Sequence, residues 1–341
     1  MRKNQIAILL LSILTGVLVL ASCNTQDADP TDSSKSGSFD SSPVDTTLLI
    51  STPGSVWYMI GNGVSECLNF SYKGSIIQLT PGNTHSNVMR LNAGDTQFAL
   101  LHNNVASEGY AGTGVFETKH DQIRSVASFY PSVLQMVVLE SVGARSLNDI
   151  IDNKIRVRLS IGNPGGATSE AFERMLALYG LTLEDMKGWG CTIYNKSQSD
   201  SSKMLSDGMI DGYLILTLAP SPSVVEASIN KKLVFVEFDR DIIAKLSEEY
   251  GYNVRTVSAG TYEFMTDDSV SVSSVTILGA SIDTPDEVVY KTVKSIHENM
   301  DYMKSIHVAL KEMTLESMIE DLGIPMHPGA EMYYREMGLI D

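Results

Sequence analysis

A turn that joins a short apolar run to an amphipathic helix places the strongest constraint on the fold of this chain. Residues 48–50 (LLI) are typical of a buried parallel strand, and Pro53-Gly54-Ser55 supplies turn-forming residues shortly after it. From residue 56 to residue 68, apolar side chains recur at helical spacing, so one face of a helix can pack on a sheet. The pattern predicts a βα unit, which is typical of open α/β sheets.

The start of this helix is suited to an anion. Its first backbone N–H groups have no partner within the helix, and together with the helix dipole they favour a carboxylate. In the alternative interpretation, the unit is purely structural and Ser55 only caps the helix. Residues 161–168 (IGNPGGAT) repeat the arrangement far downstream, again between an apolar strand and an amphipathic helix. Our hypothesis is that the two helix starts face each other across a cleft between two domains.

Length, charge and cysteine content narrow the possible functions. A chain of 341 residues is long enough for about two domains. The formal net charge of −16 argues against nucleic-acid binding, which needs a basic face, and favours solubility. Cys67 and Cys191 are far apart and have no partner at metal-ligand spacing, so buried free thiols are favoured over a disulfide. No metal and no cofactor is expected.

The amino terminus carries an export signal. A basic start (residues 1–3, MRK) precedes the apolar residues 6–20, a run that is short for a transmembrane helix of about 20 residues. Residues 20–23 (LASC) resemble the lipobox of bacterial lipoproteins, which implies cleavage before Cys23 and lipidation of its sulfur. The alternatives are a plain signal peptide or an uncleaved anchor.

The segment that follows is poor in apolar residues. Residues 24–45 are rich in Ser and Asp and cannot bury enough surface to become ordered on their own. The sequence therefore predicts a lipoprotein signal peptide at 1–22 and a disordered tether at 23–45, with the fold beginning near Asp45 or Thr46.

Small polar residues gather where predicted strands end. The ends near Thr52, Pro81, His102 and Pro164 carry Gly, Ser, Thr or Asn, and the carboxyl ends of strands are where open α/β sheets bind ligands. Thr84 or Ser86 could cap the helix after the second of these ends. His102 could contact a ligand, or it could be a helix cap or a surface group.

Two long β-rich segments suggest crossings between lobes. Residues 124–139 contain two runs split by Tyr130-Pro131, as expected for a strand that leaves one sheet and enters another, and residues 270–282 suit the return. Tyr130 could line the cleft, or it could pack at a strand end. Strands alternate with helices on both sides of the first crossing, so we expect a first lobe at 46–130 and 270–341 and a second lobe at 131–269.

Several motifs, taken in order, resemble the TAXI-type solute receptors of TRAP transporters, the tripartite ATP-independent periplasmic uptake systems. The resemblance covers almost the whole mature chain. It implies an α/β, two-lobed, periplasmic-binding-protein-like fold of type II, in which each lobe is a doubly wound mixed sheet and the ligand cleft lies between the lobes. The matching motifs are Thr52-Pro53-Gly54-Ser55-Val56-Trp57-Tyr58, Pro81-Gly82 with Asn87, residues 163–168 (NPGGAT), 207–212 (DGMIDG), 260–262 (GTY) and 327–338 (HPGAEMYYREMG).

The departures from this family lie beside the presumed ligand. Pro53 and Val56 interrupt a first turn that is usually richer in glycine, and Gly165-Gly166-Ala167 stands where Gly-Ser-Gly is common. The resemblance therefore does not fix the ligand as one of the glutamate-like or dicarboxylate compounds associated with such receptors. The aromatic pair of the last motif is expected to pack between the terminal helix and the first lobe.

The function implied is that of an extracytoplasmic, lipid-anchored binding protein of a bacterial membrane. We expect a monomer that captures a small organic acid or amino acid by lobe closure and delivers it to the membrane subunits of an ion-gradient-driven TRAP transporter. The alternatives are a ligand-sensing lipoprotein and the binding subunit of an ATP-driven importer.

An enzyme is not expected. The sequence contains no Gly-x-Ser-x-Gly elbow, no His-Glu-x-x-His and no phosphate loop ending in Gly-Lys-Ser/Thr. Gly61-Asn62-Gly63 begins a dinucleotide-like pattern, but Glu66 stands where the third glycine belongs, so no catalytic residue is assigned.

The candidate ligand-binding residues are small, amide-bearing or aromatic, and no Lys or Arg occurs in 51–69, 80–89 or 160–172. A carboxylate would then be held by backbone N–H groups and hydroxyls, unless Arg90 or Arg124 folds inward. The candidates are Gly54, Ser55, Tyr58, Gly82, Asn83, Asn87, Asn103, Tyr130, Pro164, Gly165, Gly166, Ala167, Thr168 and Tyr213.

Overall fold

The structure is a computed structural model that describes residues 39–51 and 55–341. The predicted signal peptide, the lipidation site Cys23, most of the predicted tether and the candidate Gly54 lie outside the described residues. No helix in the described part of the chain is long and apolar enough to cross a membrane.

One ten-stranded mixed sheet runs through the described chain, in the order β2-β1-β3-β10-β4-β7-β5-β6, with β8 paired to β4 and β9 paired to β10. The strands are β1 (Asp45–Ile50), β2 (Ile76–Pro81), β3 (Phe98–His102), β4 (Ile123–Leu139), β5 (Arg158–Ser160), β6 (Thr192–Tyr194), β7 (Gly212–Thr217), β8 (Leu233–Phe235), β9 (Asn253–Val257) and β10 (Ser269–Ser281).

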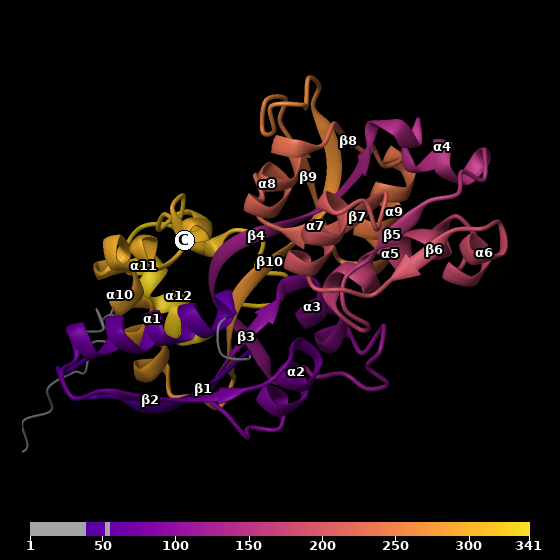
Figure 1. Cartoon of the computed structure of the whole chain (residues 1–341). Helices are drawn as coiled ribbons and strands as arrows, with labels where there is room; N and C mark the ends of the chain where they lie inside the picture. Colours follow the sequence, from indigo (N-terminus) through magenta and orange to yellow (C-terminus); the bar gives the residue numbers. More distant parts are fainter. Residues whose placement is uncertain (1–38, 52–54) are drawn as a thin grey trace, which may run out of the picture. The chain divides into compact units, whose positions relative to one another are not determined.

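Helices connect these strands in both parts of the sheet (Figure 1). Around β1 to β3 lie α1 (Val56–Ser71), α2 (Thr84–Asn92), α3 (Asn103–Ala111), α10 (Asp286–Glu298), α11 (Met300–Ile306) and α12 (Pro328–Glu336). Around β5 to β9 lie α4 (Leu147–Asp152), α5 (Ala167–Leu178), α6 (Leu183–Gly188), α7 (Gln198–Ser206), α8 (Pro222–Asn230) and α9 (Arg240–Tyr250). Three 3-10 turns complete the set: η1 (Glu140–Val142), η2 (Val308–Leu310) and η3 (Ser317–Ile319).

The hydrophobic core falls into two groups on either side of the crossing strands. The clusters of one group come from residues 44–130 and 275–334, and those of the other come from residues 133–272. We use "first lobe" for residues 46–130 and 270–341 and "second lobe" for residues 131–269, the division expected from the sequence. The two-lobed α/β fold predicted from the sequence is confirmed.

Strands β4 and β10 join the two lobes. They pair antiparallel from Ser273↔Val133 to Ser281↔Ile123, and they run side by side between the helices of the two lobes (Figure 1). The break expected at Tyr130-Pro131 does not occur, because β4 continues through it from Ile123 to Leu139. As a result, the sheets of the two lobes form one continuous sheet.

The helix starts follow the expected capping chemistry. The Ser55 hydroxyl accepts a hydrogen bond from the Tyr58 backbone N–H at 3.1 Å at the start of α1. At α2, Asn83 is the capping residue of a capping box: its side chain accepts from the Ser86 N–H, and its backbone N–H donates to the Ser86 hydroxyl. The proposed caps Thr84 and Ser86 therefore lie inside this helix.

Residues that precede β1 also contact the first lobe. Lys291 on α10 is 1% exposed, and its ammonium contacts Asp40 Oδ1 at 3.2 Å, Ser42 Oγ at 3.0 Å and Glu287 Oε1 at 2.6 Å. The ring of Phe39 also packs edge-on against an α10 tyrosine. Contacts of the first lobe thus reach residues before the expected start near Asp45 or Thr46, because Asp40 joins Glu287 in supplying the counter-charges that a buried lysine needs.

The carboxyl-terminal aromatic pair packs in the first lobe, as predicted. Tyr334 is fully buried and donates a hydrogen bond to the Val126 carbonyl of β4 at 3.0 Å, while Tyr333 packs against Tyr290 of α10. Cys67 and Cys191 are buried free thiols, which confirms the preferred interpretation of these two residues.

Candidate functional site

The order of the strands indicates where a ligand site belongs. In the first lobe, the chain leaves β1 for β2 on one side and returns to β3 on the other; in the second lobe, β5 lies between β6 and β7 in the same way. Where the strand order reverses in this way, the connections that follow two neighbouring strands run to opposite faces of the sheet. They leave a crevice outside the carboxyl ends of the strands. The carboxyl ends of β1, β3, β5 and β7 are therefore the expected site.

A cavity of about 390 Å³ lies at these strand ends and is lined by both lobes. We call it the cleft. The first lobe contributes residues 51, 55–57, 83–85, 102 and 105, and the second contributes residues 165–167, 170, 216 and 217. Tyr130 and Ser132 of β4 line it where this strand passes between the lobes. A larger hollow of about 540 Å³ beside β8 is lined only by described residues of the second lobe, so a ligand bound there would not bridge the two lobes.

Helix starts from both lobes line the cleft. Helices α1 and α2 begin there from the first lobe, and α5 begins there from the second. Gly166, the residue that precedes α5, provides no side-chain cap, so the first N–H groups of α5 are open to another acceptor. Backbone N–H groups and helix dipoles from both sides favour an anionic group in the cleft.

His102 is a neutral polar group of the cleft. It ends β3, and its ring lies 4.9 Å from that of Trp57, whose indole N–H donates to Thr276 Oγ1 at 3.0 Å. Burial, with a smaller contribution from His85, lowers the pKa of His102 to about 4. Its Nδ1 atom is buried and has no hydrogen-bond partner among the described residues, so it is available to a ligand.

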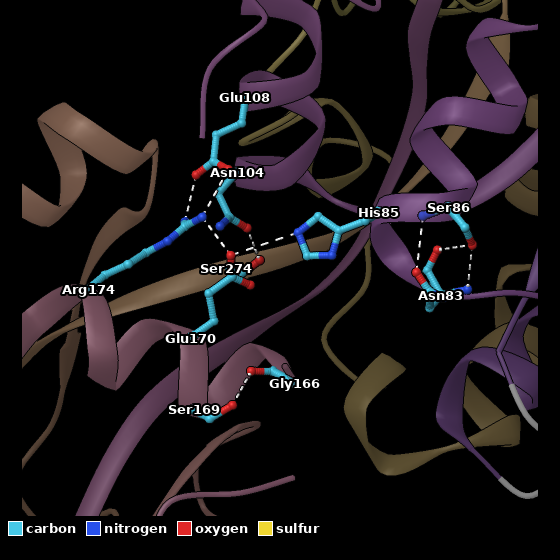
Figure 2. Close-up of polar contacts among 10 residues, drawn as sticks. All are labelled: Asn83, His85, Ser86, Asn104, Glu108, Gly166, Ser169, Glu170, Arg174 and Ser274. Atoms are coloured by element: carbon cyan, nitrogen blue, oxygen red, sulfur yellow. Dashed lines mark hydrogen bonds and ion pairs between the residues drawn. The ribbon is translucent and has the colours of Figure 1, made fainter. Parts of the chain in front are cut away.

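A charged cluster joins the lobes at one side of the cleft (Figure 2). The guanidinium of Arg174 donates to both carboxylate oxygens of Glu108, at 2.6 and 3.0 Å, and to Glu170 Oε1 at 2.6 Å. His85 points toward the same Glu170 oxygen, with 3.8 Å between Nε2 and Oε1 (Figure 2).

The pKa shift of Arg174 favours its charged form, whereas that of Glu108 favours its neutral form. Burial opposes the charge of Arg174, but Tyr252, Glu108 and Glu170 outweigh it and raise the Arg174 pKa. Burial also raises the pKa of Glu108, against the lowering effect of Arg174. The pair is charged, because the bidentate contact with Arg174 satisfies both carboxylate oxygens of Glu108 at once. Among the described residues that line the cleft, Glu170 is the one carboxylate and none is Lys or Arg.

The structure brings six of the predicted residues together in the cleft: Ser55, Asn83, Tyr130, Gly165, Gly166 and Ala167. They come from both lobes and from β4. For Tyr130, this placement favours the interpretation as a cleft residue. Neither Arg90 nor Arg124 is among the lining residues, and Arg124 donates instead to the carbonyl groups of Asp121 and Ile123.

Four predicted residues fix the scaffold instead. The amide of Asn87 donates to the Leu100 carbonyl at 3.0 Å, and the Thr168 hydroxyl accepts from the Leu216 N–H at 3.0 Å. Asn103 donates to Asn253 Oδ1 at 2.7 Å, and Tyr213 lies in the second-lobe core. Three further predicted residues are outside the lining of the cleft: Tyr58, Gly82 and Pro164.

The candidate ligand-binding residues did not include two titratable residues of the cleft, although the sequence did suggest an i,i+4 pair of Glu170 with Arg174, which the structure shows. His85 follows the second predicted turn, and Glu170 lies one helical turn after Gly166 on α5. Both could have been found from the helix starts, because residues of the first turn share the end of the helix that faces the ligand. No group of three or more His, Cys, Asp or Glu side chains within residues 39–51 and 55–341 is placed to hold a metal ion.

Comparisons with known proteins place the chain among relatives. Residues 49–338 match the model of the NMT1-like family. Similar solved structures include MatC from Rhodopseudomonas palustris with bound malate, at 13% identity and a TM-score of 0.47, covering 88% of this chain and 100% of that one. The periplasmic aliphatic sulphonate binding protein SsuA from Escherichia coli matches at 12% identity and 0.40, covering 88% and 84%. The periplasmic binding protein BugD matches at 12% and 0.46, covering 88% and 99%.

Proposed function

The chain belongs to the NMT1-like family, and from this premise and the cleft we propose that it is an extracytoplasmic solute-binding protein. The observation that carries the proposal is a cleft at the carboxyl ends of strands from both lobes, with helix starts contributed by each. A ligand that contacts both walls favours the closed arrangement of the lobes, which is how capture by closure works.

The ligand that fits best is a small organic acid or an amino acid, glutamate-like or dicarboxylate-like. The cleft volume of about 390 Å³ suits a small molecule. A carboxylate would accept from the N–H groups at the starts of α1, α2 and α5, since the lining of the cleft within residues 39–51 and 55–341 holds no Lys or Arg. Glu170 offers a partner for an ammonium group.

Delivery to a TRAP-type secondary transporter completes the proposal. The TAXI-like motifs support that partner, and the lipobox-like residues 20–23 support a lipid anchor at Cys23. We propose a monomer that carries its ligand to the membrane subunits. A neighbouring gene for a large multi-spanning permease would agree with this partner. An adjacent ATPase or sensor kinase would instead favour an ATP-driven importer or a ligand-sensing lipoprotein.

A binding role is favoured over an enzymatic one. The buried nitrogens His85 Nε2 and His102 Nδ1 have no hydrogen-bond partner in the described part of the chain, so neither activates a serine of the cleft.

The test is a thermal-shift screen of the full chain in detergent against amino acids and organic acids. A true ligand at 100 times its Kd adds about 2.7 kcal/mol to the free energy of unfolding and should raise the midpoint by several degrees. Ala167→Trp should abolish this shift, because residue 167 lines the cleft at the start of α5.

The matched control is Ala177→Trp, the same substitution at an exposed position of the same helix, which should keep the full shift. If no compound in the screen stabilises the wild type, or if Ala167→Trp responds like Ala177→Trp, the proposed receptor function is wrong.

A further inference from the structure

Arg174 links the two lobes through side chains alone. It projects from α5 of the second lobe and forms a bidentate contact with Glu108, near the end of α3 in the first lobe (Figure 2). The same guanidinium holds Glu170, its own neighbour one turn earlier, whose carboxylate lines the cleft and faces His85 of the first lobe. One cation therefore connects the lobe contact with the wall of the cleft.

The contact is almost closed to water. The Arg174 side chain is 10% exposed and that of Glu108 is 4% exposed. The guanidinium lies over the Tyr250 ring at 4.6 Å, at the end of α9. On the other side, the backbone at Gly114 approaches Glu108 so closely that an added Cβ would lie 2.3 Å from Oε2. Both oxygens of the Glu108 carboxylate are therefore turned toward Arg174, with the Gly114 backbone packed against one of them.

Helix α3 is fastened at both of its ends, but to different parts of the molecule. At its start, the Asn103 side chain accepts from the Val275 N–H of β10 at 2.8 Å and donates to Asn253 Oδ1 of the adjoining β9 at 2.7 Å, both beside the crossing strands. Near its end, Glu108 reaches the second lobe through Arg174. A rotation of the lobes about β4 and β10 would leave the first attachment in place and break the second.

Breaking the contact leaves two charged groups, each of which must be hydrated by water or find a new ionic partner. With the lobes apart, Glu108 would lose its bidentate partner and Arg174 would keep only Glu170. If Glu108 is neutralised while the lobes stay closed, its attraction to Arg174 is lost. The nearly buried Arg174 guanidinium is then left with a single carboxylate, that of Glu170. The closed arrangement therefore depends on the charge of Glu108 and on the forked geometry of arginine.

We propose that Arg174 and Glu108 form an electrostatic latch that holds the two lobes closed over the cleft, with Arg174 also positioning Glu170 in the wall of the cleft. The latch rests on contacts within the chain, while its effect on ligand affinity rests on the proposed receptor function. Arg174 acts as a positioning residue, because it reaches the cleft only through Glu170.

The test measures the distance between the lobes in the ligand-free full chain. Spin labels carried by unnatural amino acids replace Lys73 in the first lobe and Lys187 in the second, both exposed. Pulsed electron resonance then gives the distance distribution for the wild type, Glu108→Gln and Arg174→Lys. Asp211→Asn is the matched control, because Arg158–Asp211 is also a bidentate pair, at 2.6 and 3.1 Å, but lies wholly within the second lobe.

The latch predicts a larger open population in the variants. Glu108→Gln, close in shape to the wild type, should raise the fraction of long distances at least about tenfold, as expected when one partner of a buried pair is lost. Arg174→Lys should give a smaller rise, since it keeps the charge but loses the fork. Asp211→Asn should match the wild type. Unchanged distances in a folded Glu108→Gln, or an equal change in Asp211→Asn, would overturn the latch.

Ligand binding forms a separate arm, with L-glutamate and L-malate as probes. If either stabilises the wild type, its Kd should rise in Glu108→Gln by the factor by which the measured closed population falls, and it should stay unchanged in Asp211→Asn. An unchanged Kd in Glu108→Gln would overturn the claimed effect on affinity. If no compound of the full screen binds while the distances respond as expected, the receptor function fails and the latch stands.

Discussion

At the scale of single residues, His102 should make the free energy of unfolding depend on pH. Burial lowers its pKa to about 4, below the ordinary value of 6.5. Above pH 6.5, the folded and unfolded chains both carry the neutral imidazole, so this residue adds no pH dependence there. As the pH falls from 6.5 to 4, His102 binds a proton in the unfolded chain but stays neutral in the folded chain. His102 should therefore lower the free energy of unfolding by up to about 3 kcal/mol across this window.

Urea unfolding of the wild type and His102→Gln at several pH values checks this prediction. The variant should lose stability less steeply below pH 6.5, while the two curves run parallel above it. Other buried histidines, such as His327, contribute the same slope to both proteins and cancel in the comparison. Parallel curves down to pH 4 would show that residue 102 is protonated in the folded chain.

The sequence could identify residue types at the cleft better than it could identify their roles. Ser55 and Gly166 follow from the turn chemistry, since Ser and Gly are favoured at the start of a helix. Asn87 and Thr168 have the same chemistry and the same neighbourhood, yet their side chains hydrogen-bond to backbone groups of the scaffold. Whether an amide or hydroxyl faces a ligand or a strand depends on side-chain direction, which sequence spacing does not report.

At the scale of elements, Thr168 fastens the start of α5 to β7. Its hydroxyl accepts a hydrogen bond from the Leu216 backbone N–H at 3.0 Å. Thr168→Val should lower the free energy of unfolding by about 1–2 kcal/mol, because the substitution keeps the shape but removes the acceptor. Thr168→Ser, which retains the hydroxyl, is the control and should lose less. Urea midpoints at an unchanged m-value measure both, and equal losses would contradict the assigned bond.

The order of strands and helices was predictable because hydrophobic periodicity reports burial directly. The βα unit at 48–68 and its counterpart around the turn at 161–168 appear as β1–α1 and β5–α5, and β5 ends at Ser160 rather than at Ile161. The continuity of β4 through Pro131 was not predictable. Pro131 pairs with Val275 across an antiparallel ladder, and that partner lies far along the chain.

At the scale of the whole molecule, the shared sheet should make the crossing strands the most protected part of the chain. Residues Thr276–Ala280 of β10 pair with β3 on one side and with β4 on the other. In contrast, β6 is paired only with β5 among the described strands. Amide hydrogen exchange should therefore be slowest in β10 and β4 and faster in β6, because exposure of β10 requires both lobes to open.

Mass-spectrometric exchange on the folded chain would measure this order. Equal protection of residues 192–194 and 276–280 would contradict it and would indicate two lobes that unfold independently.

The indole of Trp57 has a practical consequence. It is 8% exposed, it lies against His102 in the cleft, and the sequence contains one further tryptophan, Trp189, on the second lobe. The protein thus carries an intrinsic fluorophore in the wall of its own cavity. A Trp189→Phe background would leave emission from a single wall residue, so occupancy could be titrated optically on an unlabelled chain.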